Sequence, residues 1–401
     1  MNGIVSAWRV WDLSALGPKA WADDPETDML IDSTLREGAQ QYGTYLELGI
    51  KKRILEGLFQ LGLEEIELGW AGQEGLLELA GWALNRSRHT SLCLWSPCRE
   101  GDIRLAGQTG LDSLIIGLPV SDAHMHGRLG LGRHGLLDLM AKGLEAACNA
   151  GFGTITLGLE DISRADMGFC LQLAEQACQA GVARLRLSDS RGLLSPPETA
   201  RLVKVFRSRL DVELAVHCHD DFGMATANAV SALDSGAHFA DCSLLGLGER
   251  SGIAATEELA AYLSLKTGQR AYRLEVLREL CGLVAEQAGL AVSRSKAVIG
   301  EDIFASESGL HTQALFTEPA LFEPFDPELV GGRRRIGLGG KSGMAALRLA
   351  LSRAGMSCPE PELPRLLSEV RAAAWSRRRP LADEELQELA RHVLTATSQP
   401  R

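Results

Sequence analysis

The stretch 32–40, DSTLREGAQ, holds residue types that could perform catalysis. An apolar approach at 29–31 runs into it, which is typical of a buried strand that ends in a functional loop. Arg36 and Glu37 are adjacent there and opposite in charge. Because neighbouring side chains on extended backbone point to opposite faces, we expect these two not to pair with each other and each to need another partner.

A second polar stretch, AVHCHDD at 215–221, supplies candidate partners. His217 and His219 are two residues apart at the end of a predicted strand, so their imidazoles would leave the same face. Together with the carboxylate of Glu37 they could hold a divalent ion and leave positions open for a substrate. Asp220 and Asp221 could orient the ring N–H groups by accepting hydrogen bonds from them.

Structural roles are the alternative for each of these residues. The two histidines could be hydrogen-bonded core residues, and Arg36 with Glu37 could be an ion pair at the surface. Glu249 and Arg250, in GLGERSG, are typical of a structural salt bridge. The interpretation as one site depends on these residues meeting at a single face of the fold.

Composition restricts the class of protein. The chain has 401 residues, 45% of them apolar, which is enough for one large domain and a smaller one. A net charge of −11 with dispersed lysine and arginine argues against a nucleic-acid surface. The nine cysteines stand singly, many of them in apolar runs, which indicates reduced core residues and a cytoplasmic location. We expect neither export nor membrane insertion.

Short apolar runs alternate with amphipathic segments from residue 29 onward. Eight strands, each followed by a helix, are what a (β/α)8 or TIM barrel requires. A doubly wound open sheet is the rival, but the glycine-rich phosphate loop expected after its first strand is missing from the sequence. The predicted strands are 29–35, 64–69, 91–96, 113–119, 154–160, 184–190, 213–219 and 239–246.

A change of pattern after residue 265 predicts a second, mainly helical C-terminal subdomain, whose early part could act as a lid. The expected helices are 272–290, 360–376 and 382–396. The expected division is an N-terminal extension over 1–28, a catalytic barrel over 29–270 and the C-terminal subdomain over 271–401.

Several motifs resemble, in order and spacing, the metal-dependent enzymes that condense acetyl-CoA with 2-oxo acids, among them homocitrate, isopropylmalate, citramalate and Re-type citrate synthases. LPVSD and LEDISRAD look most like the homocitrate synthases of nitrogen fixation, and the Glu after Arg36 looks like those of lysine biosynthesis. The motifs are DSTLREGAQ (32–40), LPVSD (118–122), LEDISRAD (159–166), LSDSRG (187–192), HCHDDFGMATANAVSALDSGA (217–237), GLGERSG (246–252), ESGLH (307–311), FEPFDPELVG (322–331) and GGKSG (339–343).

The resemblance implies an acyltransferase with a metal centre. Glu37, His217 and His219 would bind a divalent ion, Mn2+, Mg2+ or Zn2+, that chelates the 2-oxo acid and polarises its carbonyl. Arg36 would stabilise the alkoxide that forms as the carbon–carbon bond is made. The first substrate to expect is 2-oxoglutarate, with acetyl-CoA as co-substrate and homocitrate and CoA as products.

Three more residues match positions that handle substrates in the family. Gln40 and Ser190 would hydrogen-bond the oxo acid, and His311 would be the base that deprotonates the methyl group of acetyl-CoA. Members of the family are usually homodimers. A lyase is not favoured, because the cysteine-bearing glycine loop of the hydroxymethylglutaryl-CoA lyases is not evident in the sequence.

Three departures weaken the choice of 2-oxoglutarate. Ala215 stands where homocitrate synthases commonly have Glu, Thr156 where the lysine-type enzymes have Arg, and Phe322 where a Tyr helps the catalytic histidine. Two alternatives therefore stay open. One is the same chemistry on another 2-oxo acid, and the other is a metal-binding homologue that has lost turnover.

Overall fold

The computed structural model describes residues 28–307 and 318–397. The expected base, His311, and nearly all of the expected N-terminal extension lie outside the described residues. The chain separates into two compact units, one ending at Ala291 and one beginning at Val292. Helix α10 (Leu277–Gln287) packs on α1 (Leu48–Leu61) within the first unit. The expected domain bounds stay a prediction.

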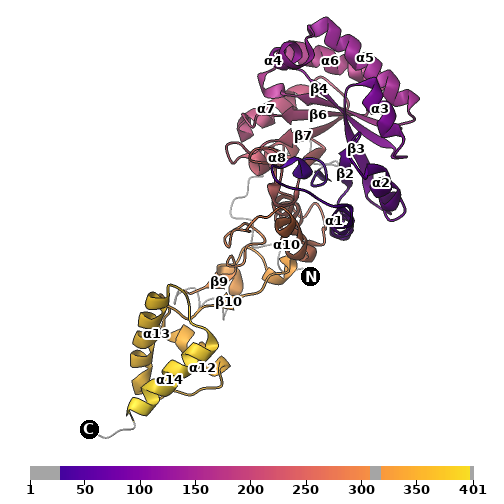
Figure 1. Ribbon diagram of the computed structural model, residues 1–401. Helices are drawn as coiled ribbons and strands as arrows, with labels where there is room; N and C mark the ends of the chain where they lie inside the picture. The colour runs from indigo at the N-terminus through magenta and orange to yellow at the C-terminus, as the bar shows by residue number, and fades with distance from the viewer. Residues whose placement is uncertain (1–27, 308–317, 398–401) are drawn as a thin grey trace. The chain divides into compact units, whose positions relative to one another are not determined.

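The first unit is a closed barrel of eight parallel strands, which confirms the predicted fold class (Figure 1). Strands pair in chain order, and β1 also pairs with β8, from Met29 opposite Phe239 to Asp32 opposite Cys242. This closing pair excludes the doubly wound open sheet. The strands are β1 (Met29–Asp32), β2 (Glu65–Trp70), β3 (Ser91–Pro97), β4 (Ser113–Pro119), β5 (Thr154–Glu160), β6 (Arg184–Asp189), β7 (Glu213–Cys218) and β8 (Phe239–Cys242).

Two strands end several residues earlier than the sequence predicts. β1 stops at Asp32 instead of residue 35, because the Asp32 carboxylate accepts the Thr34 N–H at 2.9 Å and turns the chain. β8 stops at Cys242 instead of residue 246, and a 3-10 turn over Leu244–Gly246 follows it. β4 and β5 have the predicted bounds, and the other four strands differ by one residue at one or both ends.

Helices cover the outside of the barrel (Figure 1). Their ends carry recognisable caps: Asp166 accepts the Phe169 N–H at 2.8 Å at the start of α6, and Ser195 and Glu198 form a capping box on α7. Besides α1 and α10, they are α2 (Leu76–Leu84), α3 (Glu100–Gly107), α4 (Asp122–His124), α5 (Arg133–Asn149), α6 (Met167–Gln179), α7 (Pro196–Arg207), α8 (Ala225–Leu233) and α9 (Thr256–Ala261).

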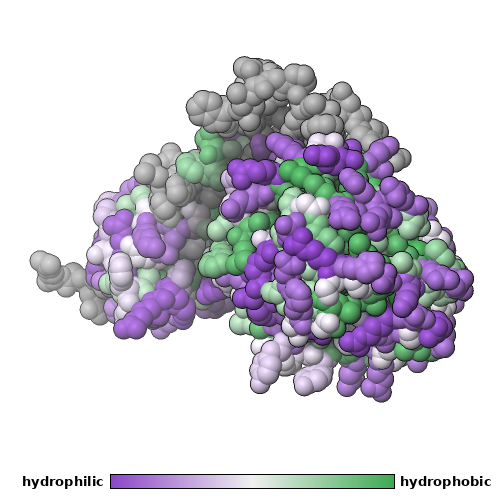
Figure 2. Space-filling view, turned by 90° about the horizontal axis from the view of Figure 1, so that it is seen from above, coloured by the Kyte–Doolittle hydropathy of each residue, from purple (hydrophilic) through white to green (hydrophobic). Residues whose placement is uncertain are grey.

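The two faces of the barrel strands are buried in different surroundings. On β6, Leu185 and Leu187 are buried on the face opposite to Arg184 and Arg186, since side chains alternate along a strand. The leucines therefore pack under the helices while the arginines reach into the barrel. Hydrophilic side chains with apolar patches among them form the visible outer face of this unit (Figure 2).

The described residues of the second unit form three α-helices, α12 (Met344–Arg353), α13 (Leu363–Arg377) and α14 (Asp383–Thr397), around a small apolar core that includes Leu347, Leu366 and Val370. A two-stranded sheet pairs β9 (Ala305–Ser306) with β10 (Arg335–Ile336). The helices expected at 360–376 and 382–396 correspond to α13 and α14. In the described part of the chain, no helix has the length and apolar content needed to cross a bilayer.

Candidate metal centre

Hydrogen bonds from three sides hold the turn that follows β1. Asp32 Oδ2 accepts the Thr256 hydroxyl at 2.6 Å, and the Ser33 hydroxyl donates to the Glu67 carboxylate on β2. The Arg36 N–H donates back to the Ser33 carbonyl at 3.1 Å. These contacts close the backbone into a turn directly beyond the C-terminal end of a barrel strand, where TIM-barrel active sites lie.

Arg36 and Glu37 pair directly, so the expectation that they would not pair was wrong. The contact joins Arg36 Nη1 and Glu37 Oε2, and it forms because the chain is turned here instead of extended. Each residue also has a second partner. Arg36 Nε donates to Glu67 Oε2 at 3.0 Å, and Glu37 Oε1 accepts the Glu249 N–H at 3.1 Å. Both side chains are therefore fixed.

The two histidines lie at the end of β7. His217 is within the strand, and His219 continues it through an isolated bridge to Ile253. Both side chains are buried, and their rings stand edge to face with centroids 5.1 Å apart. The bridge keeps the backbone extended past the strand, so the two imidazoles share one face.

Glu37, His217 and His219 bring three possible ligand atoms within 4.8 Å of one another. His217 Nε2 lies 3.8 Å from Glu37 Oε2, and His219 Nε2 lies 4.0 Å from Glu37 Oε1. Ligands about 2.1 Å from one ion can stand this far apart. His219 Nδ1 is buried and makes no hydrogen bond to the described residues. The donor set therefore fits a divalent ion that accepts nitrogen and oxygen ligands.

The charges around these residues favour their metal-binding forms. Burial alone would raise the pKa of Glu37, but Arg36 and the two histidines lower it to about 2. Burial lowers the pKa of His217 well below its ordinary value, and Arg186 lowers it further. Burial also lowers the pKa of His219. A carboxylate and neutral imidazoles are the forms that bind a metal ion.

The loop 246–252, GLGERSG, lies against Glu37 because residue 248 is glycine. A Cβ at Gly248 would be 3.0 Å from Glu37 Cγ and 3.2 Å from its Oε1. At its far end the loop accepts the Asp220 N–H on the Gly252 carbonyl at 2.9 Å. The loop thus joins the turn after β1 to the chain after β7.

The acids beside the histidines have other partners. Asp220 Oδ1 accepts the Ala225 N–H at 2.7 Å, and the Asp221 carboxylate accepts two bonds from Arg250 at 2.9 and 2.8 Å. The expectation that Asp220 and Asp221 orient the imidazoles was therefore wrong. The expected pairing of Arg250 with Glu249 was wrong for the same reason.

His217 is instead held by a carboxylate from the next strand. Its Nδ1 lies 2.7 Å from Asp241 Oδ2 on β8. Asp241 also pairs with Arg186, whose Nη1 and Nη2 each lie 3.4 Å from an oxygen of Glu67. Burial opposes the charge of Arg186, but Asp241 and Glu67 raise its pKa above the ordinary value. Burial also raises the pKa of Asp241, against the opposing effect of Arg186.

Sequence reasoning missed this buried cluster of Glu67, Arg186 and Asp241. A usable signal was present in EIEL of β2 and RLRL of β6, where charged and apolar residues alternate. In a parallel barrel both strand faces are buried, so alternating charges must face the interior and pair there.

A cavity of about 300 Å³ opens beside the three candidate ligands. Arg36, Gln40 and Ser190 line it together with Glu37, His217 and His219. The Ser190 hydroxyl accepts the Asp161 N–H at 2.9 Å, which leaves the hydroxyl hydrogen available. The structure therefore brings together all of the predicted site residues except His311, which lies outside its described part.

Trp95, Gly117, Arg128 and Glu160 also line the cavity. A Cβ at Gly117 would be 2.6 Å from the Trp95 ring and 2.4 Å from Glu160 Oε1, so glycine leaves these two side chains room. Burial raises the pKa of Glu160, although Arg128 lies 3.3 Å from it.

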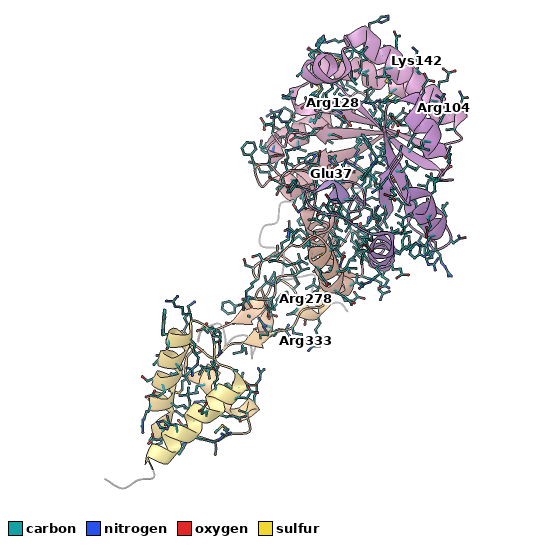
Figure 3. The ribbon with its side chains drawn as sticks, in the orientation of Figure 1. Glu37, Arg104, Arg128, Lys142, Arg278 and Arg333 are labelled. Atoms are coloured by element: carbon teal, nitrogen blue, oxygen red, sulfur yellow. The ribbon has the colours of Figure 1, made fainter. Side chains whose placement is uncertain are left out.

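Figure 3 shows where this site lies relative to the outer helices of the barrel. Glu37 lies beside the barrel strands, whereas Arg104 on α3 and Lys142 on α5 lie on the outer helices. Those two residues line a hollow of about 650 Å³ between α3 and α5.

Of the three departures from the family pattern, one, Ala215, lies beside the buried cluster of Glu67, Arg186 and Asp241. Ala215 on β7 and Gly158 on β5 both pair in register with Arg186 on β6. Thr156 pairs with Arg184, one layer lower in the barrel. Phe322, the third departure, is half exposed and belongs to the second unit.

Comparison with known proteins identifies the family and supports the fold. Residues 29–284 match the HMGL-like family, and residues 298–378 match the family described as homocitrate synthase post-HMGL domain-like. A hydroxymethylglutaryl-CoA lyase from Pseudomonas aeruginosa has a similar structure, with a TM-score of 0.60 and 22% identity. The match covers 67% of this chain and 95% of that one, and it shows the fold alone.

Curated relatives match at higher identity. The 2-isopropylmalate synthase 2 of Caldanaerobacter subterraneus subsp. tengcongensis is 34% identical, over 91% of this chain and 95% of its own length. The homocitrate synthase of Frankia sp. is 34% identical, over 92% of each chain. The resemblance read from the motifs is thereby confirmed, and the chain belongs to the HMGL-like family, in the group that contains the homocitrate and isopropylmalate synthases.

Proposed function

We propose that this chain is an acyltransferase that condenses acetyl-CoA with a 2-oxo acid, 2-oxoglutarate first, to give homocitrate and CoA. The observation that carries the proposal is the meeting of Glu37, His217 and His219 in one cavity with Arg36 beside them. The similarity to a homocitrate synthase over nearly the whole chain supports the choice of reaction.

The donor set suits a divalent ion such as Mn2+, Mg2+ or Zn2+. Such an ion, when bound, would supply Lewis-acid polarisation of the ketone of the oxo acid. Arg36 then acts on the same oxygen. Its Nε and Nη1 are engaged by Glu67 and Glu37, whereas its Nη2 makes no hydrogen bond to the described residues. That N–H group can stabilise negative charge on the ketone oxygen as it becomes an alkoxide.

The remaining chemistry is proton transfer and thioester cleavage. A base removes a proton from the methyl group of acetyl-CoA, and the methyl carbon bonds to the ketone carbon. Water then cleaves the thioester and releases CoA as the leaving group. By resemblance, His311 is the base, and Gln40 and Ser190 hydrogen-bond the oxo acid.

Isopropylmalate formation is the second candidate, since a relative of that name is 34% identical over 91% of the chain. The two reactions differ in the side chain of the oxo acid. The absence of arginine at Thr156 removes one partner for the distal carboxylate of 2-oxoglutarate, whereas the Trp95 ring offers an apolar surface.

The test is a thiol-release assay with Mn2+, acetyl-CoA and separate 2-oxo acids. We expect free CoA with 2-oxoglutarate at a kcat/KM at least tenfold above those with pyruvate, oxaloacetate and 2-oxoisovalerate. If another 2-oxo acid is preferred, the proposed substrate is wrong. If the protein binds Mn2+ but releases no CoA with any of the acids, the proposed reaction is wrong. Arg104→Met, on an outer helix, is the matched control for Arg36→Met and should leave the rate unchanged.

Three further expectations belong to the proposal. They are a homodimer, a cytoplasmic location and a role in nitrogen fixation. The first can be checked by light scattering of the purified full chain.

A further inference from the structure

The Nδ1 atom of His217 has two polar neighbours, one a hydrogen-bond acceptor and the other a hydrogen-bond donor. Asp241 Oδ2 lies 2.7 Å away and can only accept a hydrogen bond while it is ionised, whereas Arg186 Nη2 lies 3.1 Å away and can only donate one. A neutral imidazole nitrogen either carries a proton or offers a lone pair. One neighbour must therefore determine the tautomer.

Whether Nδ1 carries the proton determines whether the other ring nitrogen, Nε2, can bind a metal ion. His217 Nε2 faces Glu37 at 3.8 Å, where the candidate ion would bind. If Nδ1 carries the proton, Nε2 offers its lone pair to that point. If Nδ1 accepts from Arg186 instead, Nε2 carries the proton and cannot bind an ion.

The arrangement of the buried cluster favours Asp241. Arg186 Nη2 is itself paired with Asp241 Oδ2, so this oxygen can accept from both the arginine and the imidazole. The Arg186, Asp241 and Glu67 side chains are each at most 3% exposed. Water therefore does not compete for these hydrogen bonds.

Small neighbours let Arg186 reach this position. Gly158 and Ala215 stand beside it in register on the two adjoining strands. The guanidinium crosses the barrel to Glu67 on β2 and to Asp241 on β8. A Cβ at Gly158 would lie 4.0 Å from Arg186 Cδ, so a side chain there would contact the arginine.

We propose that Asp241, and not Arg186, is the positioning residue that holds His217 in the tautomer with a free Nε2 lone pair. The proposal deepens the proposed function and rests on its metal centre. His219 provides the contrast, since its Nδ1 makes no hydrogen bond to the described residues. The tautomer of His217 is thus set before an ion binds, whereas no hydrogen bond from the described residues sets that of His219.

Nitrogen NMR of the metal-free full chain with 15N-labelled histidine, at pH 8, tests the tautomer directly. We expect the wild-type His217 signals to show a protonated Nδ1. In Asp241→Asn the side-chain amide can donate to Nδ1, so the proton should move to Nε2. The His217 signals are assigned by their loss in His217→Gln. A wild-type spectrum with the proton on Nε2 overturns the proposal whether or not any variant folds.

Mn2+ affinity, measured by calorimetry, is the second readout. Asp241→Asn should weaken binding about ten- to a hundredfold. The matched control is Glu65→Gln, which removes another buried carboxylate that pairs with an arginine of β6, at 2.9 Å from Arg184. We expect its Mn2+ affinity to equal that of the wild type. An equal loss in both variants would show a general structural effect and overturn the proposal.

Arg186→Met separates the two members of the cluster. Asp241 remains as the acceptor for Nδ1, so the tautomer should stay as in the wild type. A proton that moves to Nε2 in this variant would assign the role to Arg186 and overturn the part given to Asp241. Failure of the wild type to bind Mn2+ would instead contradict the metal centre of the proposed function, which makes the two failures distinguishable.

Discussion

Two layers inside the barrel use the same kinds of residue for different purposes. In the lower layer Arg184 pairs with Glu65 at 2.9 Å and with Glu213 at 3.1 Å, and its guanidinium lies 3.6 Å from the centroid of the Phe239 ring. In the upper layer Arg186, two residues further along β6, pairs with Glu67 and Asp241.

The difference lies in what each layer touches. The lower arginine has acids and an aromatic ring as partners, and neither Arg184 nor Glu65 lines the cavity. The upper arginine lines the cavity and lies beside the candidate metal ligand His217, which it meets both directly and through Asp241. A buried charge pair in this barrel therefore stabilises the fold in one layer and positions a site in the next.

The largest expected difference between the layers comes from removing a ligand. His217→Ala should lower both Mn2+ content and turnover below detection, because it removes one of the three donors while the lower layer stays intact. Metal analysis and the thiol assay measure the two effects. Full turnover in this variant would contradict the assigned ligand set.

Arg184→Met should have the largest effect on stability. It leaves Glu65 buried without its partner, which costs about 3–5 kcal/mol in the free energy of unfolding. Urea unfolding measures this loss, and calorimetry should show an unchanged Mn2+ affinity for the folded fraction. A variant that is stable but binds Mn2+ weakly would remove the distinction between the layers.

Arg36→Met should instead lower turnover. The change removes a donor to the developing alkoxide and should reduce kcat by about 10²–10³, while Mn2+ stays bound. Steady-state kinetics with saturating substrates, and Mn2+ titration of the same preparation, test the two halves. Lost Mn2+ binding would show that Arg36 serves mainly to hold Glu37.

Glu213→Gln should have the smallest effect. The Glu213 side chain is 45% exposed, so its bond to Arg184 competes with water, and Glu65 remains as the buried partner. We expect the free energy of unfolding to fall by less than about 1 kcal/mol. A loss as large as that of Arg184→Met would mean that exposure does not weaken this ion pair.

The sequence predicted the barrel because its alternation of short apolar runs and amphipathic segments is a local signal. β4 and β5 have the predicted bounds, since β4 contains the apolar run LIIGL and β5 alternates apolar residues with threonine and glycine. The ends of β1 and β8 could not be predicted in the same way. They depend on the Asp32 carboxylate and on the 3-10 turn after Cys242, and the contact with Thr256 joins residues far apart in the chain.

In the candidate site, too, contacts between residues far apart in the chain could not be predicted from the sequence. The candidate ligands Glu37, His217 and His219 were identified from residue type and spacing. The partners of those residues were not, because Asp241 reaches His217 from a neighbouring strand while the adjacent Asp220 caps another segment. Proximity in sequence suggested the wrong acid, and strand register supplies the right one.

A crystal structure of the chain soaked with Mn2+, with anomalous data, tests the central claim most directly. We expect one strong anomalous peak about 2.0–2.3 Å from a Glu37 oxygen, His217 Nε2 and a His219 ring nitrogen. A protein that binds Mn2+ in solution but shows its peak elsewhere, with these three side chains unliganded, would contradict the account.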